Sequence, residues 1–432
     1  MAKRHRRRAR GQGSLSVSPA PVRGLARALL PLVTSAAVAK KEAMKVVFQA
    51  GVIELYKQLF DDAERLVGAK KKHQADRTAH FWGSTSTRIP FGGRRIRVDR
   101  PRVRHVEGHE LELPLLRELQ GEDVMPERVM EQILLGVATR GYGGSLEPLS
   151  DSVETSGTSK SSVSRKLVAK TAGQVEQVLK RRLEEVDLVA LFLDGIHVAE
   201  HAVIVALGVT TKGVKVPLGL WIGSTENAEV STSLLQDLIE RGLKIEEKIL
   251  AVIDGGKGLR RALRDVFGDL VEVQRCQIHK MRNVIAHLPE RRHTYVRRTM
   301  REAYRNASAT EARKKLQALA SWLERNGEDD AARSLREGLE ETLTIVKLGL
   351  SGALRRFFST TNAIENLVDT MRRVSRNVKR WREGDMIRRW SALGLLDAER
   401  RFRKIKGHAQ LTAFVRALRA KKTGEEKSEK AA

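Results

Sequence analysis

Two short apolar runs, each ending in an aspartate followed by glycine, place the strongest constraint on the fold of this chain. Residues 186–194 and 248–254 are rich in valine, leucine and isoleucine and have the length of strands buried on both faces. Apolar side chains at helical spacing over 227–243 predict an amphipathic helix between them. A helical crossover places the second strand parallel to one already in the sheet. We therefore expect an α/β fold in which Asp194 and Asp254 lie at strand ends along one edge of the sheet.

The segments that follow these runs extend the expected sheet. Residues 201–210 and 214–221 have strand patterns and are separated by a short turn with a glycine, so they predict an antiparallel meander. A further strand is expected over 271–276, followed by a helix over 280–287. The sheet would then combine antiparallel and parallel strands.

The two aspartates predict a metal site if they lie close together, because neighbouring carboxylates repel unless a cation lies between them. Hard divalent ions suit oxygen ligands, and two such ions can activate water and stabilise a leaving oxygen in phosphodiester chemistry. The alternative is that Asp194 and Asp254 only cap the helices after their strands. Glu365 offers a third acid early in a helix that begins near Thr361, although a glutamate there is often only a favourable partner of the helix dipole. His197 would point away from Asp194 if the first strand continues, and its role stays open.

An ordered set of motifs carries a resemblance to a known family. After the two strand-Asp-Gly elements, the chain contains a Cys-x-x-His step and a Thr-Asn-x-x-Glu-Asn run, formed by Cys276, His279, Arg282, Asn283, Thr361, Asn362, Glu365 and Asn366. This order resembles the Mutator-type family of bacterial insertion-sequence transposases, collinearly over about residues 92–403. The Cys-x-x-His step and the run around the glutamate are the most specific parts of the match.

The resemblance implies a ribonuclease H-like catalytic core, interrupted by an all-helical insertion, with a DDE triad of Asp194, Asp254 and Glu365. The triad would bind two Mg²⁺ ions, with Mn²⁺ as an alternative, and the nucleophile would be water or a DNA 3′-hydroxyl. The partners would be double-stranded DNA, as terminal inverted repeats and as target, and a second copy of the chain in a synaptic homodimer. The helical, proline-free pattern of residues 297–349 supports the insertion independently. In similar enzymes an insertion tryptophan stacks on an unpaired base; Trp322 could do so, although packing in a helical core is the more common role.

Cys276 is the only cysteine of the chain, which excludes an intramolecular disulfide and fits a reducing compartment. A structural zinc site needs about four ligands, and Cys276 with His279 supplies two, so zinc would require remote partners. The resemblance instead implies support of the active site by Cys276, His279, Arg282, Asn283 and Asn362. Local support of a strand-to-helix turn is the alternative for the first two.

The charge of the chain favours a polyanionic partner. Its formal charge is +27 and its isoelectric point is near 10.4. An anionic membrane surface would also attract it, but no apolar run approaches the length of a membrane span and the N-terminus lacks a secretory cleavage pattern. We therefore expect a cytoplasmic, nucleoid-associated bacterial protein without a membrane partner.

Two regions are candidates for DNA contact. Helices are expected over 126–138, over 146–153 and from residue 157 onward, with Ser159 as the N-cap of a helix-turn-helix recognition helix. The exposed residues of that helix would be Lys160, Ser161, Ser164 and Arg165. The second region follows Glu365 and would clamp the DNA backbone with Arg372, Arg373, Arg376, Lys379 and Arg380. A chance match of the helix-turn-helix pattern and a merely solvated basic face are the alternatives.

These elements give an expected domain order. It comprises a disordered basic arm (1–36), a helix with a small β-hairpin (37–115), a helical helix-turn-helix region (116–183), a ribonuclease H-like core in two parts (184–296 and 350–407) around the helical insertion (297–349), and a C-terminal helix with a charged tail (408–432). Within the region 37–115, the helix is predicted over residues 37–67, and the hairpin is predicted over residues 94–104 and 109–113. A DNA transposase that cleaves and transfers strands explains the set best. The rivals are a non-catalytic DNA-binding regulator and a ribonuclease H-like nuclease that resolves junctions.

Overall fold

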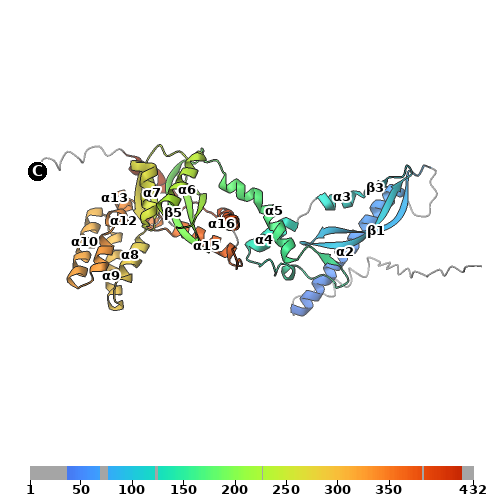
Figure 1. Ribbon diagram of the computed structural model, residues 1–432, viewed down its shortest axis with the longest axis horizontal. Helices are drawn as coiled ribbons and strands as arrows, with labels where there is room; N and C mark the ends of the chain where they lie inside the picture. Colours follow the sequence, from blue (N-terminus) through green and yellow to red (C-terminus); the bar gives the residue numbers. More distant parts are fainter. Residues whose placement is uncertain (1–36, 69–75, 122–124, 226, 382–383, 421–432) are drawn as a thin grey trace, which may run out of the picture. The chain divides into compact units, whose positions relative to one another are not determined.

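The computed structural model describes residues 37–68, 76–121, 125–225, 227–381 and 384–420 (Figure 1). The expected basic arm and the charged tail beyond residue 420 lie outside these ranges. The chain forms two compact units, the first made of residues up to 132 with 137–167 and the second of 133–136 with the residues from 168 onward. Among the described helices, none is long and apolar enough to cross a membrane.

The first unit is a helix packed on a small antiparallel sheet. Its elements are α2 (Ala37–Val67), β1 (Ala79–Phe91), β2 (Arg94–His105), β3 (Glu110–Leu111), α3 (Pro114–Gly121), α4 (Met125–Leu134), η1 (Gly143–Ser145), β4 (Thr155–Ser156) and the beginning of α5 (Lys160–Leu179). Strand β2 is central, because β1, β3 and β4 all pair with it. Helix α2 contacts β1 and β2, and its apolar side chains close a core with Ile89, Ile96 and Val98.

The predicted helix and hairpin of this unit are confirmed, since α2 has the expected bounds and β2 pairs with β3. Strand β1 was not predicted, because its central residues are small and polar and show little apolar alternation. A two-glycine turn joins β1 to β2, with Gly92 and Gly93 at φ values of 54° and 81°. Positive φ at both central positions is the requirement of a type I′ hairpin turn, which glycine meets without strain.

The helix predicted over 146–153 is wrong. The chain forms a short 3₁₀ turn at Gly143–Ser145 and then runs irregularly until β4. Pro148 falls inside the predicted span, lacks a backbone N–H and disfavours helical geometry at Glu147. Of the flanking predictions, the helix expected over 126–138 forms as α4 but ends earlier, at Leu134. The predicted N-cap is confirmed, because the Ser159 hydroxyl accepts the Ser162 N–H at 3.3 Å at the start of α5.

The second unit is built on a five-stranded mixed sheet in the order β7-β6-β5-β8-β9. Its strands are β5 (Leu188–Val198), β6 (His201–Thr210), β7 (Lys215–Gly223), β8 (Ile249–Ile253) and β9 (Val271–Arg275). The first three form the predicted antiparallel meander, and β8 and β9 run parallel to β5. The α/β prediction is therefore confirmed.

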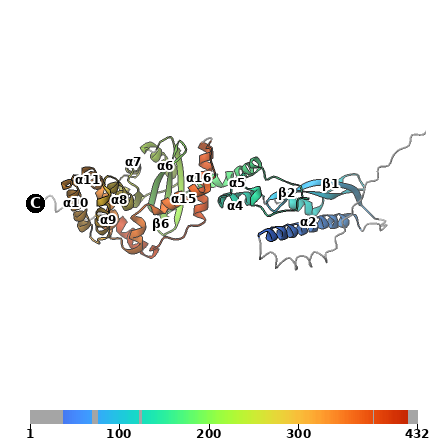
Figure 2. The same ribbon diagram turned by 90° about the horizontal axis from the view of Figure 1, so that it is seen from below.

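Helices cover both faces of this sheet. On one face, Leu191 and Leu193 of β5 pack in a core with α6 (Ala228–Glu240) and α7 (Lys257–Phe267). On the other face, Phe192 joins a larger core that includes α15 (Asn362–Ser375) and α16 (Gly384–Glu399). Figure 2 shows α15 and α16 lying against the strands of the meander, in agreement with their contacts to β5, β6 and β7. Because successive side chains of β5 point to opposite faces of the sheet, this strand contributes to the cores on both faces.

A helical segment stands between β9 and α15. It consists of α8 (Gln277–Ala286), α9 (Glu290–Arg305), α10 (Ala309–Arg325), α11 (Asp329–Arg336), α12 (Leu339–Thr342), α13 (Thr344–Lys347) and α14 (Gly352–Phe358), and α17 (Leu411–Arg419) follows later. Figure 1 shows α9 and α10 side by side, and their contacts agree. The buried Lys280 of α8 ties this segment together by donating to the carbonyl oxygens of Ser334, at 2.5 Å, and Glu337. Burial lowers the pKa of Lys280 to about 8.

One detail of the sheet differs from the sequence-based expectation. We expected Asp194 at the C-terminal end of its strand, but β5 continues to Val198 and pairs with β6 along its whole length. The pairing of β5 with the shorter β8 ends at Phe192, just before Asp194, although β5 itself continues. The strand beyond this point has only β6 beside it, which allows polar side chains to reach solvent.

Candidate active site

The register of two parallel strands aligns Asp194 with Asp254. Ala190 of β5 pairs with Leu250 of β8, and Phe192 pairs with Val252. Continuing the same register by two residues brings Asp194 level with Asp254, which directly follows β8. Both aspartates are partly exposed beside strands whose preceding residues are fully buried.

A tight turn positions the Asp254 carboxylate. Its Oδ1 accepts the N–H of Gly256 at 2.8 Å, just before α7 begins. Gly255 between them has a φ of 111°, and a Cβ at this position would collide with the guanidinium of Arg275. Asp254 thus orders the turn before α7 without capping that helix, since no side chain caps α7, and its carboxylate stays partly exposed at the sheet edge.

Thr361 connects the third acid to the Cys-x-x-His step. The Thr361 hydroxyl lies 2.5 Å from Oε1 of Glu365, 3.2 Å from Nδ1 of His279 and 3.4 Å from Sγ of Cys276. Glu365 Oε1 accepts the single hydroxyl hydrogen, so His279 donates its Nδ1–H to the Thr361 oxygen. The backbone N–H of Thr361 donates to Cys276 Sγ at 3.4 Å. A chain of hydrogen bonds thus runs from His279 through Thr361 to Glu365.

The electrostatics of this cluster join it to Asp254. Burial raises the pKa of the Cys276 thiol, but hydrogen bonds from His279 and Thr361 outweigh burial and lower it overall. The hydrogen bond with Cys276 raises the pKa of His279 against the opposing effect of burial, and the nearby carboxylates of Glu365 and Asp254 raise it further. His279 therefore lies within electrostatic reach of both acids, and Nδ1 is 3.9 Å from Glu365 Oε1.

The remaining residues expected to support the site lie on its exposed borders. Arg282 and Asn283 are exposed one turn after His279 on α8, while Asn362 is exposed as the first residue of α15. His197 is exposed on β5 and, three residues from Asp194, points to the opposite side of the strand. The structure thus brings possible ligand atoms of Cys276, His279 and Glu365 within 4.8 Å of one another, while strand register aligns Asp254 with Asp194.

The family model of the transposases of the Mutator family matches residues 32–404. The chain belongs to this family. It is 27% identical over 316 residues to the transposase for insertion sequence element IS256 in transposon Tn4001 of Staphylococcus aureus, which covers 70% of this chain and 76% of the relative. It is 32% identical over 180 residues to the transposase for insertion sequence element ISRM3 of Rhizobium meliloti, covering 42% and 44%. With the transposase for IS1201 of Lactobacillus helveticus, it shares 31% identity over 199 residues, covering 44% and 51%.

The residues expected to contact DNA through the first unit of this Mutator-family transposase lie on an exposed helix face. Lys160, Ser161, Ser164 and Arg165 are all exposed in the first turns of α5. Their spacing of three and four residues places them on neighbouring positions of one side of the helix. The face offers two cations and two hydroxyls to solvent.

The cations expected to clamp DNA after Glu365 divide into two groups. Arg372, Arg376, Lys379 and Arg380 are exposed, and Arg372 forms an ion pair with Asp369 at 3.4 Å. The guanidinium of Arg373 instead bonds to the buried carboxylate of Asp397 at 2.5 Å and to the Leu134 carbonyl oxygen at 3.1 Å. Arg373 therefore helps to hold α15 against α16 and offers less of its charge to a ligand.

Trp322 lies partly buried within the insertion. Its ring is 4.7 Å from the ring of Tyr295, and the Arg292 guanidinium stands 5.1 Å from the ring centre. Trp322 also packs against the large core of the unit. These contacts favour a packing role over stacking on a base.

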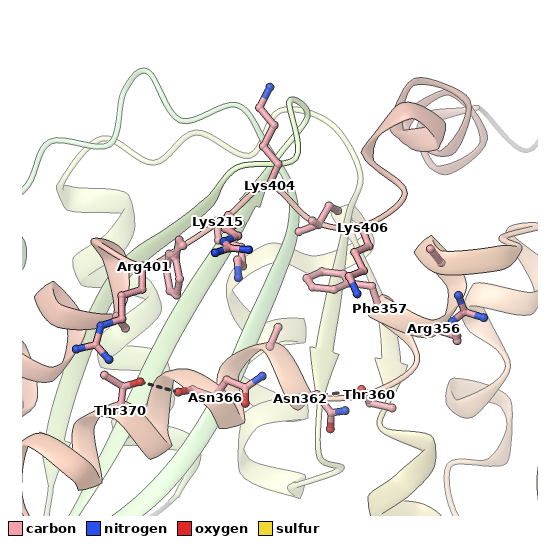
Figure 3. Close-up of a pocket in the computed structure, with 16 residues that line it drawn as sticks. Lys215, Arg356, Phe357, Thr360, Asn362, Asn366, Thr370, Arg401, Lys404 and Lys406 are labelled. Carbon is pink, nitrogen blue, oxygen red and sulfur yellow. Dashed lines mark hydrogen bonds between the residues drawn. The ribbon is translucent and has the colours of Figure 1, made fainter.

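Sequence reasoning missed the central role of Thr361, which it placed only at the start of a helix and in the motif around Glu365. The hydroxyl and amide of Thr361 meet Cys276 across a separation of 85 residues. The one available signal was the occurrence of both residues in motifs of the same ordered set. It also missed a basic pocket at the start of α15, described below (Figure 3).

Proposed function

We propose that this transposase of the Mutator family moves an insertion sequence by metal-dependent cleavage and transfer of DNA strands at terminal inverted repeats. The observation that carries the proposal is the alignment of Asp194 with Asp254 by strand register, with Glu365 on α15, a helix that packs against β5. Three carboxylates on adjacent elements form the type of site that phosphodiester chemistry uses. Family membership supports the same reaction class.

The proposal includes a ribonuclease H-like core. It is supported by a sheet in which three antiparallel strands are followed by two parallel ones, and by the helical segment that separates Asp254 from Glu365 in the chain. The acids come from β5, the end of β8 and the first turn of α15. Such a core holds its acids on rigid elements while the insertion adds surface around them.

The donor set fits Mg²⁺ better than a soft ion. Asp194, Asp254 and Glu365 offer only oxygen atoms and are partly exposed, and Mg²⁺ prefers oxygen ligands and retains water. Cys276, His279 and Glu365 also place possible ligand atoms within 4.8 Å of one another. The Cys276 thiol, however, is buried and accepts a hydrogen bond from the backbone N–H of Thr361, which suits a structural role. Two bound Mg²⁺ ions would generate a nucleophile at neutral pH and stabilise the leaving oxygen.

The residues of the chain orient these acids. The Gly256 N–H fixes one oxygen of Asp254, and the Thr361 hydroxyl fixes one oxygen of Glu365. His279 holds a proton at Nδ1 that keeps the Thr361 hydroxyl aimed at Glu365. Because the carboxylates of Asp254 and Glu365 are held in this way, less conformational freedom is lost when a substrate strand binds.

Binding of the inverted repeats is assigned to the exposed face of α5. Short polar residues and arginine near a helix N-terminus can reach base edges in the major groove, and Ser161, Ser164 and Arg165 have this placement. Two ends must be held together for strand transfer, so the functional assembly is proposed to be a homodimer on DNA.

Substitution of the aspartates tests the proposal. Asp194→Asn and Asp254→Asn should each reduce cleavage of end DNA in Mg²⁺ by roughly a thousandfold, because several kcal/mol of charge stabilisation are lost. Both variants should bind end DNA as the wild type does. Asp265→Asn, at an exposed position on α7, is the matched control and should cleave within about twofold of wild type.

The measurement is gel-resolved cleavage of a labelled inverted-repeat duplex, with and without EDTA. Cleavage retained by either aspartate variant would refute the metal assignment. Binding without cleavage by the wild type would favour a DNA-binding regulator. Cleavage of branched DNA irrespective of its end sequence would favour a junction nuclease.

A further inference from the structure

A concave pocket of about 580 Å³ lies within the second unit, between β7, α14, α15 and the segment after α16 (Figure 3). Six cationic residues line it, and no carboxylate does so among the described residues. The cations are Lys215, Arg356, Arg401, Arg403, Lys404 and Lys406. Arg401 and Arg403 belong to the basic region after Glu365 that the sequence predicted to contact DNA, whereas the other four were not expected to do so.

The positive charge of this pocket is poorly compensated. Burial lowers the pKa of Lys215, and the Lys215 ammonium lies 4.6 Å from the centre of the Phe402 ring. Of the six cations, only Arg401 forms an ion pair with a carboxylate in the described part of the chain, with Asp397 at 2.9 Å. A partly buried cation without a carboxylate partner is costly, and a bound anion would remove that cost.

One wall of the pocket is the polar side of α15. Asn362, Asn366 and Thr370 recur at intervals of four residues and all line it. Amide side chains can both donate to phosphate oxygens and accept from sugar or base groups. Glu365 immediately precedes Asn366, so the same helix carries the pocket wall and the candidate catalytic acid. Figure 3 shows Asn362 and Asn366 below Lys215 and Lys406, with Phe357 beside them.

The size of the pocket decides between forms of nucleic acid. Its volume falls within the range of sites that enclose a small ligand, so it can take one or two nucleotides but not the full width of a duplex. A positively charged hollow with an aromatic side chain is the arrangement that holds unpaired nucleotides, through phosphate contacts and stacking. Phe357, which also lines the pocket, supplies that side chain.

We propose that this pocket binds an unpaired end of a DNA strand next to the active acids. Lys215, Lys404 and Lys406 contact its phosphates, and the α15 amides contact the sugar and base edges. The inference rests on the proposed function for the identity of the polymer, but it concerns binding and requires no divalent ion. A DNA strand bound in this pocket would have its end beside Thr360 and Asn362. These two residues flank Thr361, whose hydroxyl donates to Glu365.

The test compares binding of two DNAs to the full-length chain in EDTA. The probes are a fluorescein-labelled short duplex with a single-stranded 3′ overhang and its blunt counterpart, measured by anisotropy over a range of salt concentrations. The pocket variant is Lys215→Gln/Lys404→Gln/Lys406→Gln. The control is Arg297→Gln/Arg301→Gln/Arg305→Gln, which removes three exposed charges from α9.

The pocket variant should bind the overhang duplex at least tenfold more weakly, lose the preference for the overhang, and show a salt slope smaller by about 2, since each phosphate contact on a single strand contributes about 0.7. The control should retain the preference. Asn366→Asp, an exposed substitution that adds one negative charge to the wall, should act in the same direction without removing any packing contact.

Equal binding of both DNAs by the wild type, or an unchanged overhang preference in both the lysine variant and Asn366→Asp, would overturn the proposal. These outcomes are separate from failure of the proposed function. If the wild-type chain prefers the overhang but never cleaves DNA, the pocket proposal is supported and the proposed catalytic function is contradicted. If cleavage is normal and the pocket variants have no effect on binding, the catalytic function is supported and the pocket proposal is contradicted.

Discussion

Single side chains determine how the candidate acids point. Thr361 is fully buried, and its one hydroxyl serves Glu365 while accepting from His279. Cys276 contributes a buried thiol that accepts from the same threonine. The motif around Glu365 could be recognised from the sequence, but these contacts could not. They depend on the placement of α8 beside the start of α15, which the backbone bond from Gln277 N–H to the Ser359 carbonyl oxygen fixes at 2.9 Å.

Replacing Thr361 with valine should separate positioning from folding. Valine has nearly the same shape but cannot donate to Glu365, so cleavage should fall by roughly 10- to 100-fold, as expected for the loss of a hydrogen bond to a charged group. Thr361→Ser retains the hydroxyl and should stay within about threefold of wild type. The readout is the rate of end cleavage together with its Mg²⁺ dependence, because a misdirected Glu365 should raise the Mg²⁺ concentration required.

A merely structural role for Thr361 would give a different pattern. Thr361→Val would then lower the unfolding temperature, while its cleavage rate below that temperature and its Mg²⁺ requirement would match those of the wild type. That result would show that Thr361 does not position Glu365.

At the level of elements, the strands and long helices follow from periodicity, and the departures have local causes. The continuous apolar runs of β5 and β6 and the amphipathic face of α6 were sufficient to predict the central sheet. The helix prediction over 146–153 was wrong because the apolar spacing was interpreted as helical although Pro148 lies within the span. The polar strand β1 carries too little apolar pattern to be recognised alone, and it becomes a strand because β2 pairs with it along its length.

The turn after β8 provides a test at this scale. Gly255→Ala should destabilise the second unit by about 1–3 kcal/mol, because alanine is strained at a φ of 111° and its Cβ meets the buried Arg275. Gly384→Ala is the control, since Gly384 begins α16 without a positive φ and has open space around its Cβ position. Thermal unfolding, followed by circular dichroism, measures both.

The control substitution should be neutral or slightly stabilising, because alanine favours helix over glycine. Cleavage by Gly255→Ala should also fall, since the turn orients Asp254 through Gly256. An unchanged melting temperature for Gly255→Ala would show that the turn relaxes without cost and would weaken its assigned role in holding Asp254.

At the scale of the whole molecule, the sequence carries a formal charge of +27, and its described residues include distinct basic surfaces that the proposed reaction would use in turn. The exposed face of α5 offers sequence readout, the cations after Glu365 offer backbone contacts, and the pocket beside α15 offers a place for an unpaired end. The overall charge could be read from composition. The pocket could not, because Lys215 and Lys406 come together only when the segment after α16 returns to β7, where the Ile405 N–H donates to the Gly213 carbonyl oxygen at 3.0 Å.

The most direct test of the central claim is excision of a plasmid-borne element flanked by its own ends, compared for wild type, Glu365→Gln and Asp369→Asn by sequencing the junctions. Both substitutions lie on α15 and remove one carboxylate charge, but Asp369 is exposed and paired only with Arg372 among the described contacts. The account predicts junctions at the inverted repeats with wild type and Asp369→Asn, and none with Glu365→Gln. Junctions from Glu365→Gln at the wild-type frequency would contradict it.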